Sequence, residues 1–140
     1  MMSNKWLFII VLLSCACAGN AATTLMQKDE IFNQFYADFQ KAVKIGDKEQ
    51  VASMTDFDDG FTWEANERFR QIKSKAAFLK NYNEMFTATI KNKIATAKPE
   101  KIDDNSFFIN WHTKNLEYSL HFYRQGDGGF KFEGLAVGPY

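Results

Sequence analysis

The last third of this sequence alternates large apolar residues with polar ones, and this alternation limits the fold more than any other feature. Apolar residues occupy every second position over 107–111 and again over 118–122. A period of two is typical of strands with one buried face. The three glycines within 125–129 favour a hairpin turn, after which 130–137 is expected to form a third strand.

One antiparallel register places all the large apolar residues of these strands on a single face. Its predicted pairs are Trp111–Tyr118, Ile109–Leu120, Phe107–Phe122 and, across the turn, Phe122–Phe132. A slip by one residue would turn the whole set outward, so the register is well specified. Continued alternation beyond Phe132 also predicts that Gly134 and Ala136 face inward.

Helical spacing dominates the part of the chain before these strands. Apolar residues recur three and four positions apart, and Gly46 is a natural stop for the first helix. Asp47 and Ser74 are expected to cap later helices. Helices are expected over 30–45, 47–54, 74–86 and 90–97, and short strands over 61–64 and 68–72.

This order of elements resembles the NTF2-like (cystatin-like) superfamily, whose α+β cone packs N-terminal helices in a curved antiparallel sheet. The likeness rests on the helical opening at 32–35, the break at Gly46 and Asp47, and the run 72–78, and it extends over most of 30–137. It implies one NTF2-like domain over 30–140. Members include isomerases, cyclases, dehydratases, transport adaptors and non-catalytic binders, so the resemblance leaves function open.

Residues 1–22 predict a secretory signal peptide. Lys5 precedes eight apolar residues at 6–13, and small residues follow them. So short an apolar run cannot cross a bilayer core of about 30 Å as a helix. We therefore expect an exported protein of the periplasm or cell surface, with 23–29 as a tether.

Both cysteines of the chain, Cys15 and Cys17, lie in this leader. The residues before each of them resemble the lipobox of small exported bacterial lipoproteins, in which the cysteine is acylated. Plain cleavage after Ala18, Ala21 or Ala22 is the alternative. In either case the domain contains no cysteine, which excludes disulfides, thiol chemistry and cysteine-ligated zinc from it.

Charge excludes two further classes of partner. The chain has 17 Lys and Arg against 17 Asp and Glu, and removal of the leader takes away only Lys5, leaving 16 against 17. A near-neutral domain lacks the basic footprint that nucleic acid or an anionic membrane surface requires. Membrane attachment is expected only through an N-terminal lipid.

Few residues suggest catalysis or metal binding. Asp56, Asp58 and Asp59 could supply a base at a cavity mouth, although they suit a solvated turn better. His112 and His121 are expected to face outward beside Glu117 and Glu133, and two histidines on separate strands make a poor metal site. We therefore predict no catalytic residue, metal or cofactor.

A ligand pocket is expected on the inward face, where small residues leave room beside aromatic ones. Its predicted lining residues are Trp63, Trp111, Tyr118, Gly134 and Ala136. On the outer face, Phe108 and Tyr123 suggest a surface through which a homodimer could form.

These observations favour an exported, non-enzymatic binding domain of the cell envelope that takes a small apolar ligand or a protein partner. One alternative is a small isomerase- or dehydratase-like enzyme with its acid or base at residues 56–59. Another is an inhibitor or immunity-type protein that neutralises a toxin or hydrolase.

The leader makes a prediction about processing. The mature protein should begin between Cys15 and Thr23 and should lack Trp6, which intact-mass measurement will show. A diacylglycerol adduct on Cys15 or Cys17 identifies a lipoprotein, and an unmodified start identifies plain cleavage. A product that retains Met1 contradicts export.

Overall fold

The computed structural model describes the backbone of residues 20–140 and side chains from residue 27 onward. The predicted lipidation candidates Cys15 and Cys17 lie outside the described residues. The elements are α1 (Asn20–Ile45), α2 (Lys48–Ser53), β1 (Phe61–Ala65), β2 (Arg68–Ile72), α3 (Lys75–Met85), α4 (Ala88–Thr96), β3 (Glu100–Lys101), β4 (Ser106–His112), β5 (Leu116–Arg124) and β6 (Phe130–Pro139).

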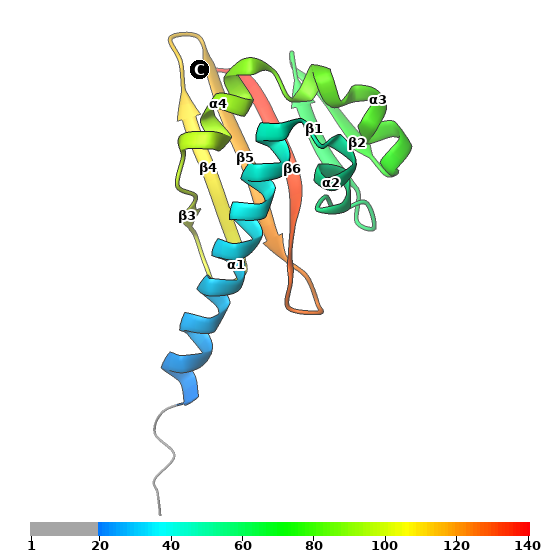
Figure 1. Cartoon of the computed structure of the whole chain (residues 1–140). Coiled ribbons are helices and arrows are strands. Elements are labelled where there is room, and N and C mark those ends of the chain that lie inside the picture. Colours follow the sequence, from blue (N-terminus) through cyan, green and yellow to red (C-terminus); the bar gives the residue numbers. More distant parts are fainter. Residues whose placement is uncertain (1–19) are drawn as a thin grey trace, which may run out of the picture.

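The six strands form one curved sheet in the order β2-β1-β6-β5-β4-β3, with the helices packed on one of its faces (Figure 1). This architecture confirms the predicted α+β class. The sheet is mixed, however, because β1 pairs with β6 in parallel whereas the other pairings are antiparallel. No hairpin joins β1 to β6, so no turn fixes their relative direction.

The predicted register of β4, β5 and the start of β6 is confirmed, including Trp111 opposite Tyr118 and Phe122 opposite Phe132. Beyond Phe132 the prediction is wrong. A β-bulge follows, with Glu133 as the extra residue, and it places Gly134 opposite His121 and Ala136 opposite Ser119. Since a bulge shifts the alternation by one residue, Gly134 and Ala136 face outward.

The helix boundaries follow from local capping. Gly46 has φ of 75° and ends α1, while the backbone N–H of Asp47 donates to the carbonyl of Ala42 at 2.9 Å. The carboxylate of Asp47 then accepts from the N–H of Gln50 at 3.0 Å and begins α2. The Ser74 hydroxyl caps α3 in the same way.

Residues 23–29 belong to α1 and do not form the separate segment expected between leader and domain. Ion pairs join this part of the helix to β3 and to the loop that follows it. Lys101 of β3 contacts Asp29 at 2.9 Å, and Lys28 contacts Asp104 at 3.9 Å. These contacts are far apart in the chain, so sequence spacing does not reveal them.

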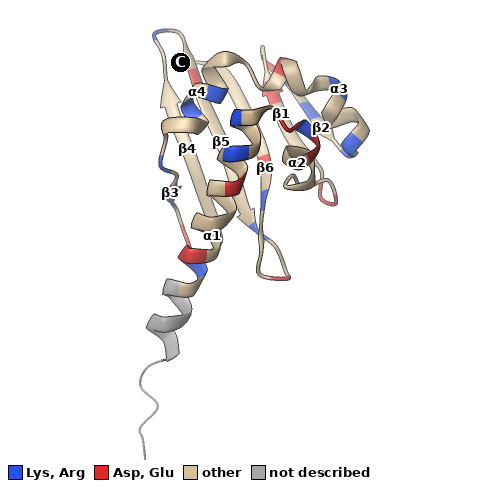
Figure 2. Ribbon diagram, in the orientation of Figure 1, with Lys and Arg blue, Asp and Glu red and all other residues tan. Residues whose placement is uncertain are grey.

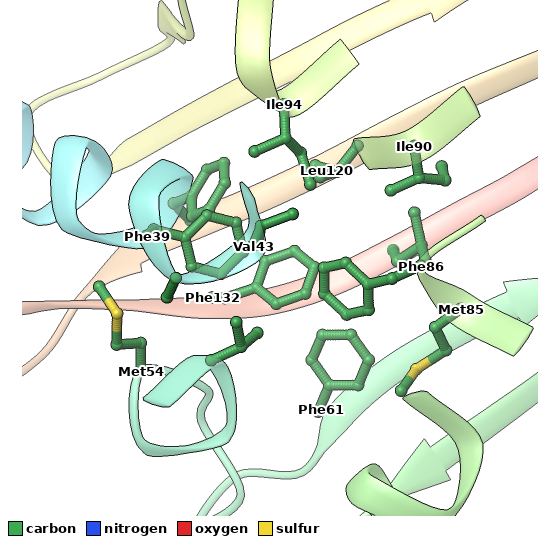
Figure 3. Packing of buried hydrophobic residues seen from close by; sticks show 14 of the residues in the cluster. Phe39, Val43, Met54, Phe61, Met85, Phe86, Ile90, Ile94, Leu120 and Phe132 are labelled. Atoms are coloured by element: carbon green, nitrogen blue, oxygen red, sulfur yellow. The ribbon is translucent and has the colours of Figure 1, made fainter. Parts of the chain in front are cut away.

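Aromatic side chains fill the space between α1 and the sheet. Phe32 stacks on Phe107 with 3.6 Å between ring centres, and Phe39 lies 5.3 Å from Phe122 and 5.1 Å from Phe132. Figure 3 shows Phe39, Val43 and Met54 converging with Phe61, Phe86 and Phe132 in this core. Burial of large apolar surfaces, as in this core, is the main favourable contribution to the free energy of folding.

Figure 2 shows basic and acidic residues along α1, whereas the charged residues of α4 are the two lysines Lys91 and Lys93. Within residues 20–140, no helix combines the length and apolarity needed to cross a membrane.

Phe39 provides a test of the core. It is fully buried, so Phe39→Ala should lower the free energy of unfolding by about 3–5 kcal/mol through lost burial and a residual cavity. Phe69→Ala is the matched control, because Phe69 is 67% exposed and its loss should change stability by less than about 0.5 kcal/mol. Urea unfolding measures both. Equal effects would show that α1 does not form the core.

Candidate functional site

A cavity of about 210 Å³ lies between the sheet and the junction of α3 with α4. It is found where β1 ends, β5 begins and β6 approaches its last residues. Its walls are mostly apolar and include Trp63, Met85, Ile90, Tyr118, Leu135 and Val137. An outer hollow of about 330 Å³ shares Asn66, Leu116 and Val137 with it, so the cavity continues toward the surface there.

Three elements position the cavity walls. Trp63 faces inward from β1, is 2% exposed, and lies beside Leu135 of β6 in the parallel ladder. The bulge at Glu133 brings Leu135 and Val137 onto this inner face. Thr87 ends the link after α3 and caps α4 by accepting from the N–H of Ile90 at 3.4 Å.

Two charged side chains lie beside the cavity, and one of them, Glu84, lines it. Arg70 of β2 lies directly opposite Trp63, and its guanidinium carbon is 4.5 Å from the Trp63 ring centre. One guanidinium nitrogen is 3.7 Å from the carboxylate of Glu84, which lines the cavity. These side chains are 42% and 60% exposed, so the ion pair is in contact with solvent.

The predicted pocket residues have different positions. Trp63 and Tyr118 both line the cavity. Trp111 stacks on Tyr118 with 4.6 Å between ring centres and supports that wall without lining it. Gly134 and Ala136 instead line a smaller hollow on the outer sheet face, where the bulge has turned them.

The alternative acidic site does not meet the cavity. Asp56, Asp58 and Asp59 precede β1, whereas the cavity lies at its far end, about 13 Å of strand away. The expectation of a wholly solvated turn is wrong for Asp56, which is 5% exposed. Its carboxylate accepts from the N–H of Asp58 at 3.0 Å, which explains how the turn holds a buried acid.

The outer sheet face carries His121 beside Glu133, as predicted, with Nδ1 and the carboxylate 3.1 Å apart. Burial lowers the pKa of His121. Burial also raises the pKa of Glu133, and the negative charges of Asp56 and Asp59 raise it further. His112 lies opposite Glu117, as predicted, and stacks on Tyr140 with 4.4 Å between ring centres.

On the same face, Phe108 stacks on His121 with 4.0 Å between ring centres, and the side chain of Tyr123 is 39% exposed. The homodimer across this face stays a prediction. In the part of the chain that the structure describes, no three His, Cys, Asp or Glu side chains are placed to hold a metal ion.

Sequence reasoning missed several residues of the cavity. The sequence pattern could have identified Leu135 and Val137. The large apolar residues of this strand occupy even positions before Glu133 and odd positions after Gly134, which indicates a bulge between them. No sequence pattern identifies Arg70 and Glu84, since they lie on separate elements and meet only in the folded chain.

Comparison with known proteins bears on the fold. No protein-family model matches the sequence, and no curated protein matches it. A solved NTF2-like protein of unknown function from Shewanella oneidensis is similar, with 10% identity, a TM-score of 0.51, and coverage of 78% of this chain and 97% of that one.

Two further structures are similar at lower scores. One is a ketosteroid isomerase-like protein from Shewanella frigidimarina, with 11% identity, a TM-score of 0.44, and coverage of 79% of this chain and 97% of that one. The other is a scytalone dehydratase-like protein from Novosphingobium aromaticivorans, with 10% identity, a TM-score of 0.47, and coverage of 85% of this chain and 88% of that one. Since both scores are below 0.5, the fold assignment depends on the first structure and on the topology. The chain has the NTF2-like fold.

Proposed function

We propose that this protein is an exported, non-enzymatic binding domain of the cell envelope that holds a small apolar molecule in the cavity beneath α3 and α4. The observation that carries this proposal is the cavity itself: about 210 Å³ of space walled by Trp63, Tyr118 and aliphatic side chains. Ligand pockets are typically concave and mostly apolar with a few polar groups, and this solvent-accessible cavity has that character.

The chemistry of the lining supports binding over catalysis. Among the described lining residues, Glu84 is the one carboxylate and no histidine is present. Glu84 is mostly exposed and lies beside the Arg70 guanidinium, so its carboxylate is not held in the dry, apolar surroundings that tune a general base. The acids at residues 56–59 are too distant to act on a molecule in this cavity.

The proposed location depends on the sequence of residues 1–22. Lys5, the apolar run after it and the small residues around Cys15 and Cys17 favour export. An envelope protein with a mostly apolar cavity would take up a sparingly soluble molecule and shield it from water.

Filling the cavity tests the proposal. Val137→Phe should weaken binding of a neutral bicyclic probe, 2-naphthamide, by at least about tenfold, because the added ring occupies the probe's space. NMR titration that follows the Trp63 indole N–H measures the dissociation constant, with the protein processed from the full chain.

The control is Ala136→Leu, on the neighbouring residue of β6 and the opposite face of the sheet. It should leave binding unchanged. If the probe causes no shift at Trp63 in the unaltered protein, or if both variants weaken binding equally, the cavity is not a binding site.

A further inference from the structure

We infer that the ligand of this cavity is an aromatic carboxylate, with its ring beside Trp63 and Tyr118 and its acid group on Arg70. This inference rests on the proposed function: the ring is the apolar part that the cavity holds, and the acid group is a charged end that lies outside the apolar walls. It follows from the position of Arg70, from the long ionic contact between Arg70 and Glu84, and from the aromatic walls of the cavity.

The sheet positions Arg70 against two cavity residues, Trp63 and Glu84, although Arg70 is not itself a lining residue. It lies opposite Trp63 in the β1–β2 ladder and therefore projects from the inner face. Its guanidinium covers the Trp63 ring at 4.5 Å, a cation–π contact that restrains the side chain without using its N–H donors. The charge is thus held beside a ring that lines the cavity.

The donors of Arg70 are available. A guanidinium has five N–H groups in a planar fork that matches a carboxylate. Among the hydrogen bonds of the described residues, none uses this guanidinium, and its ionic contact with Glu84 is long at 3.7 Å. A ligand carboxylate could form the paired, charge-assisted hydrogen bonds that Glu84 does not make.

Glu84 is a weak competitor for the same site. Its side chain is 60% exposed and can move into solvent, and exposed ion pairs contribute little to stability. Charges of both signs lie near the cavity. Lys93 is 5.5 Å from the ring of Trp111, which stacks on the cavity residue Tyr118, whereas Glu67 lines the outer hollow. The free N–H donors of Arg70, and not the overall charge of the lining, are therefore what favours an anionic ligand.

The walls favour a flat ring system. Trp63 and Tyr118 present aromatic surfaces, and the thioether of Met85 makes favourable contacts with ring edges. A volume of about 210 Å³ is below the usual range of about 300–1,000 Å³ for drug-sized ligands, which limits the ligand to one or two rings.

The test compares 2-naphthoate with 2-naphthamide, which has the same shape and no charge. In the unaltered protein, NMR titration at Trp63 should give about tenfold tighter binding of the carboxylate. Arg70→Gln should remove this preference, so that the carboxylate and the amide bind with similar dissociation constants. Arg70→Lys, which keeps the charge and loses the fork, should retain part of it.

Glu84→Gln separates ligand binding from a structural role of the ion pair. If Arg70 binds the carboxylate, this variant should tighten 2-naphthoate binding, the opposite sign to Arg70→Gln, because the competitor is gone. Two substitutions that only broke a structural contact would act in the same direction, and that result overturns the inference.

The two proposals fail in distinguishable ways. Equal binding of both probes to the unaltered protein overturns the role of Arg70 and leaves the cavity as a binding site. Absence of binding by either probe overturns both. Thermal unfolding of each variant checks that it is folded, which is expected because both side chains are substantially exposed.

Discussion

The β-bulge at Glu133 determines what each half of β6 contributes to the molecule. Before it, Phe130 and Phe132 face the helices and pack around α1. After it, Leu135 and Val137 take the inner positions and become cavity walls. The bulge also turns Gly134 outward, where a Cβ would lie 2.5 Å from the Thr62 hydroxyl, so any larger residue at this position would displace the Thr62 side chain of β1.

The two ends of the inner face therefore differ in packing. Under α1, pairs of phenylalanines fill the space, as with Phe32 against Phe107. Toward the junction of α3 with α4, the inward side chains of β6 are aliphatic and shorter, and the link at Phe86 carries the chain from one helix to the next. The space that remains between these elements is the cavity, which is bounded by the rigid sheet on one side and by helices on the other.

Sequence periodicity predicted the α+β class, the helix caps and the β4–β5 register, because each depends on neighbours close in the chain or on one repeated pattern. The prediction failed where one extra residue shifted the inward–outward alternation of β6: the bulge at Glu133 moved Gly134 and Ala136 to the outer face. It could not anticipate the parallel pairing of β1 with β6, since no turn joins them. Of the cavity, Trp63 and Tyr118 were identifiable, whereas the approach of Arg70 to Glu84 arises only from folding.

On β2 the aromatic side chain faces solvent and a charged side chain faces inward, the reverse of what is usual for an edge strand. This arrangement affects the cavity. Phe69 points outward and is 67% exposed, while Arg70 points inward over Trp63. Charge on an edge strand discourages pairing with another chain, but an arginine on the outer face would serve that purpose equally well and would leave Phe69 free to be buried. The observed order instead places a cation beside the cavity at the cost of an exposed aromatic ring, which is understandable if the inner position of Arg70 has a function of its own.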